Sequence, residues 1–331
     1  MKLSPALLTL LLALILAVIA FLSLFIGAAD LGAGDILAAL AGHAKETTEI
    51  IVVELRLPRM VMGILAGATL GLSGAALQGL LRNPLADPGI IGVSSTAGLG
   101  AVMAIYFGLS SVFPLSIQIM SMGGAIFATL ILSFISSRDS SVLTLILAGI
   151  GISSLATAAI ALTMNFAPNP MSLQDMIMWL MGSLDNRTLN DILLAGPFIL
   201  GGWLIMRGVG QGLEACSLGE DTARTLGIDL KRLRMKVILG SAISVGATVS
   251  VCGAIGFVGL VVPHMVRSLI GYAPGRLLLP SALLGAILLT LADLVTRIPL
   301  GHGQLRLGVV TAFIGSPLFL YIIYQTRKAM R

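Results

Sequence analysis

Residues 55–98 read LRLPRMVMGILAGATLGLSGAALQGLLRNPLADPGIIGVSSTAG, and the fold can be worked out from this stretch. An uncharged, glycine-rich run over residues 60–81 is long enough to cross a bilayer as a helix, at about 1.5 Å per residue. Small residues recur on one face of that helix, at Gly63, Gly67, Gly71 and Gly74. Such spacing lets helices approach closely in a membrane, where water supplies no hydrophobic push between them. The pattern predicts a helix surrounded by other helices, which ends at the charged, proline-broken turn 82–88.

The whole chain has the composition of an all-α, polytopic membrane protein. Its 331 residues are 57% hydrophobic and 11% charged, and the mean hydropathy is +1.03, far from the values of soluble proteins. Cys216 and Cys252 fall in a charged loop and an apolar helix, which argues against a disulfide framework. The histidines are scattered without zinc-site spacing, and no GxxxxGK[ST] phosphate loop is present. If the chain transports a solute uphill, the energy must therefore come from a partner or from an ion gradient.

Apolar runs and their breaks predict ten membrane crossings. The first run is longer than the core of a signal peptide, so we expect an uncleaved first helix. The eighth is short and interrupted, a pattern found where helices line a pathway and also where a proline merely kinks a packed helix. The ten predicted segments are about 6–26, 60–81, 89–107, 113–135, 142–166, 191–206, 236–254, 255–270, 277–296 and 306–325.

The basic residues predict the orientation of the chain. With the N-terminus inside, the inner segments hold fourteen of the 20 Lys and Arg residues and the outer segments hold six. An excess of Lys and Arg on the cytoplasmic side is the usual bias of membrane proteins, so both termini are expected in the cytoplasm. The net charge of +5 then reflects topology, and nucleic acid is not expected as a partner.

Two stretches echo one another along the chain. RLPR at 56–59 leads into a glycine-rich helix with SGA at 73–75, and RLR at 232–234 leads into another with CGA at 252–254. Five predicted helices separate the two starts, and an odd number gives the two halves opposite topology. The echo favours an inverted repeat of the kind common in transporters.

Three motifs carry a resemblance to a known family. LRLPR at 55–59 followed by SGAALQGLLRNPLADPGIIGVSSTAG at 73–98 resembles the second-helix signature of the FecCD family of importer permeases. LGEDTARTLG at 218–227 and GAIGFVGLVVPHMVR at 253–267 are similar to later motifs of the family, in the same order. The resemblance spans essentially the whole chain. It implies one transmembrane permease domain over residues 1–331, with helices two to five and seven to ten related as an inverted repeat.

The same resemblance implies a function and a set of partners. The chain is expected to be a transport subunit, not an enzyme and without a cofactor, in an ABC importer of the bacterial inner membrane. Its cargo would be a metal chelate, with iron-siderophore expected ahead of haem and cobalamin. The implied partners are two ATP-binding subunits, a periplasmic or lipid-anchored substrate-binding protein, membrane lipid, and a second copy or a paralogue.

An ion-coupled secondary transporter is the alternative function. Such carriers keep ionisable groups inside the membrane as ion or proton relays. Asp293 is the only acid well inside a predicted helix, and it lies about one turn from Arg297. We interpret the two as a pair that caps the outer end of that helix, which disfavours the alternative.

The loop 207–236 is the expected contact with the ATP-binding subunits. Its segment 218–227 reads as a short amphipathic helix, with acids near the N-terminal end of the dipole and Gly227 as a stop. Ala223 and Leu226 are predicted to share an apolar side that is exposed unless a partner covers it; the other interpretation is a surface helix that rests on its own subunit. The resemblance implies a coupling helix made of Leu218, Gly219, Glu220, Asp221, Ala223, Leu226 and Gly227.

The outer surface has its own candidates. Arginines at outer helix ends commonly anchor a helix in lipid headgroups, but the resemblance implies that Arg56, Arg59 and Arg297 receive acidic residues of the binding protein. The methionine-rich loop 167–190 is typical of an interfacial helix with Trp179 at headgroup level, and it follows the fifth crossing, where the family places a short gate helix. The small or helix-breaking residues expected in helix packing or in the pathway are Gly67, Gly71, Gly74, Gly256, Gly259 and Pro263.

One departure from the family pattern stands before the last helix. The family commonly has Glu-(Leu/Ile)-Pro-Val-Gly, whereas this chain has QLRLG at 304–308. The acid and the helix-starting proline are missing, and Arg306 adds a cation. The geometry near Arg297 and the choice of partner are the features that this change affects.

Overall fold

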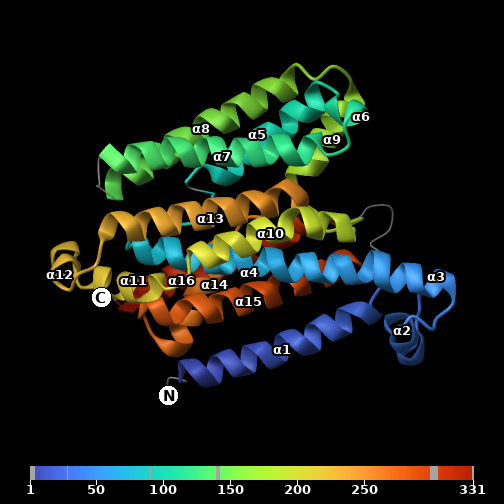
Figure 1. The fold of residues 1–331 in the computed structure, drawn as a ribbon, viewed down its shortest axis with the longest axis horizontal. Coiled ribbons are helices and arrows are strands. Elements are labelled where there is room, and N and C mark those ends of the chain that lie inside the picture. Colours follow the sequence, from blue (N-terminus) through green and yellow to red (C-terminus); the bar gives the residue numbers. More distant parts are fainter. Residues whose placement is uncertain (1–3, 28, 90, 139–141, 299–304, 330–331) are drawn as a thin grey trace.

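The computed structural model describes residues 4–27, 29–89, 91–138, 142–298 and 305–329, and within these ranges it is helical without strands (Figure 1). The predicted all-α class is therefore confirmed. The first half contains α1 (Pro5–Phe25), α2 (Ala33–Leu40), α3 (Glu46–Glu49), the π-helix η1 (Ile50–Arg56), α4 (Leu57–Leu80), α5 (Val93–Tyr106), α6 (Leu109–Val112), α7 (Ser116–Arg138) and α8 (Val142–Asn165). The second half contains α9 (Pro170–Leu180), α10 (Leu189–Ile205), α11 (Val209–Ser217), α12 (Glu220–Thr225), α13 (Leu230–Cys252), α14 (Val258–Ile270), α15 (Pro274–Thr296) and α16 (Leu307–Ala329).

Six helices in the described ranges are long and apolar enough to cross a membrane, and the bent pair α10–α11 makes up to seven. The six are α1, the continuous stretch from α3 through α4, α7, α8, α13 and α15. Three shorter apolar helices, α5, α14 and the first part of α16, occupy the predicted third, eighth and tenth positions. A helix of 13 or 14 residues rises only about 20 Å, less than the roughly 30 Å of the hydrocarbon core. Each predicted segment is thus helical, while ten full crossings stay a prediction.

The neighbours of each helix follow the predicted inverted repeat. Helix α4 packs against α15 as α13 packs against α7, and α4 and α13 pack against each other. Helix α5 contacts α7 and α8, as α14 contacts α15 and α16. Exchanging α4, α5, α7 and α8 for α13, α14, α15 and α16 therefore leaves this set of contacts unchanged.

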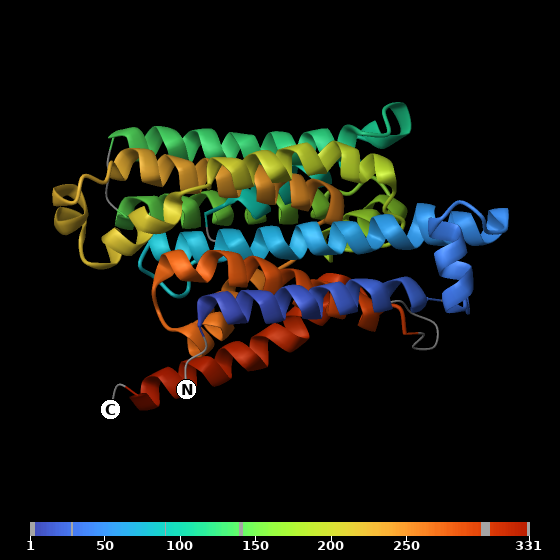
Figure 2. The same cartoon turned by 60° about the horizontal axis from the view of Figure 1, so that its bottom comes forward.

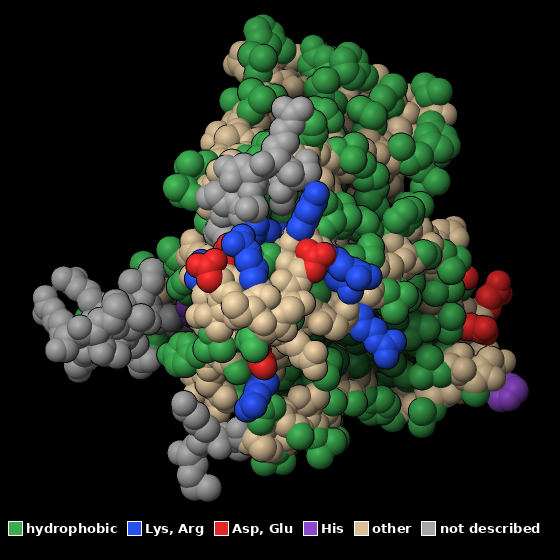
Figure 3. Space-filling view, turned by 60° about the vertical axis from the view of Figure 1, so that its left-hand side comes forward, with side chains coloured by type: hydrophobic (Ala, Val, Ile, Leu, Met, Phe, Trp, Pro, Cys, Tyr) green, Lys and Arg blue, Asp and Glu red, His purple; other side chains and the backbone are tan. Residues whose placement is uncertain are grey.

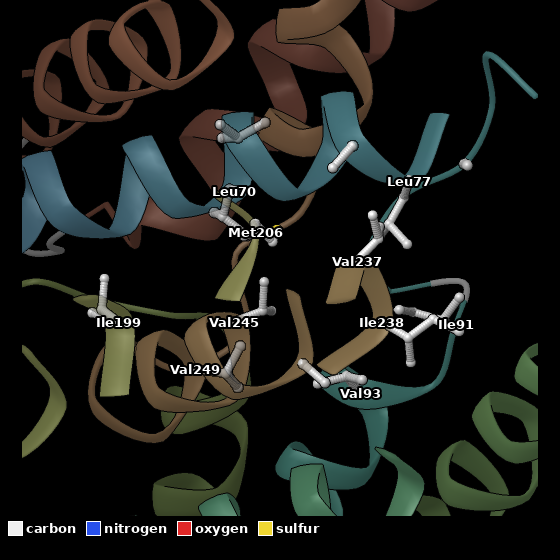
Figure 4. Close-up of a cluster of buried hydrophobic side chains, with 14 of the residues drawn as sticks. Leu70, Leu77, Ile91, Val93, Ile199, Met206, Val237, Ile238, Val245 and Val249 are labelled. Carbon is white, nitrogen blue, oxygen red and sulfur yellow. The ribbon is translucent and has the colours of Figure 1, made fainter. Parts of the chain in front are cut away.

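Helices α4 and α13 form the centre of the molecule, and the close-up in Figure 4 shows their buried side chains facing one another. In α4 these are Leu70 and Leu77, in α13 Val237 and Val245, and Met206 follows α10 between them. The most apolar window of α13 is 78% buried, against 17% for α8 and 28% for α1. The outer helices therefore turn most of their apolar side chains outward, where membrane lipid is expected to cover them.

The two ends of the bundle differ in what they carry. The start of α1, the end of α16 and α12 lie at one end, and α2, α3 and α6 lie at the other (Figures 1 and 2). Figure 3 shows Lys and Arg side chains gathered on the end that carries α12. The orientation predicted from the basic residues, in which the α12 end is cytoplasmic, stays a prediction.

Candidate functional site

Helix α12 forms at the predicted place in the loop between α11 and α13, with a glycine on each side. Gly219 precedes it with φ +111°, and Gly227 follows with φ +80°, conformations that other residues rarely adopt. The side chain of Asp221 is 99% exposed, and Leu218 and Leu226 are exposed at 68% and 62%. The segment therefore presents two leucines and an acid to the outside of the bundle.

The expectation for Ala223 is wrong, because its side chain is fully buried within its own subunit. Helix α12 packs against α11 and α13 through this residue, so Ala223 is not on the exposed apolar side with Leu226. Glu220 holds the helix from another direction. Its Oε1 accepts from Arg234 Nη2 at 2.8 Å and lies 3.9 Å from Arg82 Nη2. The segment rests on its own subunit and still exposes a leucine pair.

The turn that follows α4 links this end of the bundle to α14. Gln78 donates to the carbonyls of Gly259 and Leu260 at 3.3 and 3.2 Å, and His264 Nε2 lies 2.9 Å from the carbonyl of Pro84. The pKa of Asp87 lies above its usual range because the carboxyl group is buried. The 2.8 Å hydrogen bond from the Gly89 amide to its Oδ1 offsets only part of this rise. Arg82 belongs to the same turn and lies near Glu220 of α12. The turn therefore contacts both α12, through Arg82, and α14, through Pro84.

At the opposite end, two of the three predicted docking arginines are buried on α1. Arg56 Nη1 donates to the carbonyls of Leu24 and Phe25 at 2.6 and 3.0 Å. Arg297 Nη1 donates to the carbonyls of Ser23 and Ile26 at 2.6 and 2.8 Å. The last carbonyls of a helix have no partner inside the helix, so two guanidinium groups satisfy them here. The arginines do anchor a helix end, but to protein carbonyls, which no local pattern in the sequence indicates.

Arg59 and Asp293 are the centre of an ion-pair network at this end. Arg59 Nε lies 2.9 and 3.0 Å from the two carboxylate oxygens of Asp293, and Arg59 Nη1 lies 2.5 Å from Asp185 Oδ1. Asp293 is only 2% exposed and also pairs with Arg297 at 2.7 Å. The predicted pairing of Asp293 with Arg297 is confirmed, and the structure adds Arg59 as a second partner. A buried carboxylate between two arginines satisfies its charge internally.

The segment that follows α9 is bonded to two helices of the second half. The amides of Leu307 and Gly308 donate to the carbonyls of Gly182 and Met181, at 3.2 and 3.0 Å. On the other side, the Ser183 amide donates to the Cys252 carbonyl at 2.8 Å. Arg187 Nη1 donates to the carbonyl of Val251 at 2.7 Å. The segment 181–187 therefore joins α9 to the end of α13 and the start of α16, a role that sequence reasoning missed. Its one local signal is the paired glycines Gly182 and Gly253, both with positive φ.

The predicted packing and pathway residues separate into two groups. An ideal Cβ at Gly67, Gly71 or Gly74 would lie 2.0–2.3 Å from a carbonyl of α15 or α14, so these glycines allow close helix packing. A Cβ at Gly259 would lie 2.7 Å from the carboxylate of Asp87 and 3.2 Å from the carbonyl of Leu70, and Pro263 is buried within α14. Gly256 instead lines a cavity of about 610 Å³ between the end of α9, the break before α14, and α16. Gly256 is thus the pathway candidate of the set, next to the helix that the methionine-rich loop forms.

Comparisons with known proteins place this geometry in context. The model of the FecCD transport family matches residues 14–325. The vitamin B12 import system permease protein BtuC of Vibrio cholerae is 40% identical over 285 residues, 84% of each chain. The BtuC of Salmonella typhi is 36% identical over 321 residues, 96% of this chain and 94% of that one. The cobalamin import system permease of Halobacterium salinarum is 38% identical over 282 residues, 84% of this chain and 74% of that one.

A solved structure has the same fold as this chain over nearly the full length of both. It is described as an inward-facing conformation of a metal-chelate type ABC transporter. The match has a TM-score of 0.87 at 32% identity and covers 97% of this chain and 100% of that chain.

Proposed function

Because the chain belongs to the FecCD transport family, we propose that it is the membrane-spanning subunit of a binding-protein-dependent ABC importer. The observation that supports the coupling role is the segment 218–227 around α12, which exposes Leu218, Asp221 and Leu226 at the end of the bundle where Figure 3 shows basic side chains. A short helix with a glycine before and after it, flanked by two exposed leucines, is a compact shape for a groove in an ATP-binding subunit. The protein itself breaks no bond; it presents two conformations whose populations its partners shift.

We propose vitamin B12 as the cargo, within the wider class of metal chelates. The import permeases at 36–40% identity that are named for a cargo are named for vitamin B12 or cobalamin, whereas the resemblance to the family had placed iron-siderophores first. The similar solved structure, named for metal chelates in general, is compatible with either. The chelate would be handed over by a binding protein at the α3 end and released at the α12 end, in the bacterial inner membrane with both chain termini in the cytoplasm.

The proposed assembly contains two ATP-binding subunits, one substrate-binding protein, and a second copy of this chain or a paralogue. The cavity beside Gly256 and the exposed face of α16 support a pathway at the contact between two membrane subunits, since Phe313 lines that cavity and is 83% exposed. An ion-coupled mechanism has less support, because Asp293 is paired with two arginines and is not free to relay protons.

The proposal is tested by reconstitution into liposomes with the ATP-binding subunits and the binding protein. We expect uptake of cyanocobalamin that requires ATP and the binding protein, and that persists when ion gradients are collapsed. A ferric siderophore offered in parallel tests the cargo class. Uptake driven by a proton or sodium gradient without the ATP-binding subunits would overturn the importer assignment. Uptake of the siderophore without uptake of cyanocobalamin would overturn the assignment of vitamin B12 as the cargo.

A further inference from the structure

A second cavity, of about 280 Å³, lies beside α9 and shares no lining residue with the cavity that Gly256 lines. It is lined by α9, the segment that follows it, the ends of α5 and α13, and residues of α6 and α7, which meet at one corner of the molecule (Figure 1). Pockets for drug-sized ligands span about 300–1,000 Å³. The cavity therefore suits a small polar group and not a bulky metal chelate.

Two opposite charges in the lining of this cavity are not used by the fold. The side chain of Asp175 is exposed and has no hydrogen bond or ion pair with any residue that the structure describes. Arg306 Nη1 lies 4.0 Å from Asp185 Oδ2, beyond hydrogen-bond length. Asp185 has a closer partner in Arg59, whose Nη1 lies 2.5 Å from its Oδ1. The cavity thus offers the carboxylate of Asp175 and the guanidinium group of Arg306 to a ligand.

The other cations at this end of the bundle are not available to the cavity. Arg187 also lines it, but its Nε and Nη1 donate to the carbonyls of Asp185 and Val251. Lys45 is exposed just before α3 and does not line the cavity. The lining therefore carries two carboxylates and two guanidinium groups. This balance favours a ligand that itself carries both a positive and a negative charge.

The surroundings of the cavity are apolar. Ile105, Ile117 and Met178 form part of its lining, and Trp179 adds an amphipathic ring of the kind enriched at lipid headgroup level. The start of α7 and the link before it expose Phe113 and other large apolar side chains close to Ile117 in the chain, namely Leu115 and Ile119. A charged cavity beside an exposed apolar surface matches the two parts of a phospholipid, a polar headgroup and its acyl chains.

We infer that this cavity binds the headgroup of a zwitterionic phospholipid, with the phosphate on Arg306 and the ammonium group on Asp175. A guanidinium group binds phosphate oxygens by paired hydrogen bonds, and a carboxylate accepts hydrogen bonds from an ammonium group. The inference goes beyond the proposed function, because it involves neither the cargo nor a partner protein. A soluble phosphoethanolamine ester has the same charged groups as the lipid, so the experiment has to include both.

The inference predicts different effects for the two charged residues. Native mass spectrometry of the delipidated full-length protein in detergent measures the binding of phosphatidylethanolamine and phosphatidylglycerol with the same acyl chains. We expect the ethanolamine lipid to bind about tenfold more tightly, because only its headgroup carries an ammonium group for Asp175. Asp175→Asn should abolish this preference and leave the binding of phosphatidylglycerol unchanged. Arg306→Gln should weaken the binding of both lipids about tenfold, because both carry the phosphate.

Glu46→Gln and Lys45→Gln are the matched controls, because both residues are exposed at the same end and neither lines the cavity. Both controls should keep the preference and the affinity. Equal binding of the two lipids by the unmodified protein, or a preference that survives Asp175→Asn, overturns the inference. Should Arg306→Gln fail to fold, Asp175→Asn decides alone, since no described contact depends on that side chain. If glycerophosphoethanolamine competes as well as the intact lipid, the ligand is a soluble zwitterion and the phospholipid assignment is wrong.

Discussion

At the residue scale, three glycines on α4 bring neighbouring helices into backbone contact. An ideal Cβ at Gly71 would lie 2.1 Å from the carbonyl oxygen of Ser281 on α15, and at Gly67 it would lie 2.3 Å from that of Gly285. No side-chain rotation relieves a clash with a main-chain oxygen. The spacing of small residues is therefore a requirement of α4–α15 packing, not a loose preference for small side chains.

We expect Gly71→Ala to destabilise the folded protein by about 3 kcal/mol or more, because inserted atoms force a well-packed contact apart. Thermal unfolding of the purified protein in detergent measures the effect. Gly123→Ala on α7 is the control, since a Cβ there meets nothing within 4 Å. Alanine has the better helix propensity, so the control is expected to be neutral or slightly stabilised. Equal transition temperatures for the two variants would contradict the packing role.

At the scale of a single element, α12 combines an internal attachment with an external face. Ala223 and the Glu220–Arg234 pair hold it on its own subunit, and Leu218 and Leu226 project outward. Replacing Glu220 would disturb the attachment as well as any contact with a partner. The leucine pair separates the two roles, because it has no part in the buried core.

The double variant Leu218→Asp, Leu226→Asp is expected to reduce co-purification of the ATP-binding subunits by about tenfold or more, since a few buried apolar anchors carry most of the affinity of an interface. Membrane insertion should be unaffected, because the substitutions lie outside the buried core. Val112→Asp on α6 is a control with a comparably exposed apolar side chain (85%) at the other end of the molecule. Co-purification of the double variant at the unmodified stoichiometry would mean that α12 is only a surface helix.

At the scale of the whole molecule, the two ends of the bundle are chemically distinct. One end carries α12, the start of α1 and the end of α16, and the other end carries α2, α3 and α6 (Figure 1). The Arg59–Asp293 network lies at this second end. Orientation in the membrane then decides which partner meets which surface. Both native cysteines are buried, so thiols introduced at exposed positions report orientation against a low background.

We expect Asp221→Cys and Val112→Cys to be labelled from opposite sides of the membrane by an impermeant maleimide. The label should reach Cys at 221 in inverted vesicles and Cys at 112 in intact spheroplasts. The unsubstituted protein is the control for reaction at Cys216 and Cys252. Labelling of both positions from the same side would contradict the proposed orientation.

The sequence by itself determined the class of the protein, most helix positions and the existence of α12. These features depend on local properties that a window of residues contains: apolar run length, glycine spacing, and breaks at Pro84, Gly219 or Gly227. The inverted repeat was also visible as an echo of RLPR and RLR, because equivalent helix starts need similar residues. The short α5 and α14 were placed correctly, although their length fell below what a full crossing needs.

Only the tertiary structure decided which partner each polar side chain takes. Arg59 and Asp293 are 234 positions apart in the chain, and nothing near either one indicates the other. Arg56 was predicted to face a partner protein. The end of α1 lies against it instead, and its guanidinium group donates hydrogen bonds to the carbonyls of that helix end. Ala223 was expected to be exposed for the same reason, since its helix pattern does not show that α11 and α13 pack beneath it. Periodicity reports which residues share a face, whereas burial and charge pairing depend on what the rest of the chain places opposite that face.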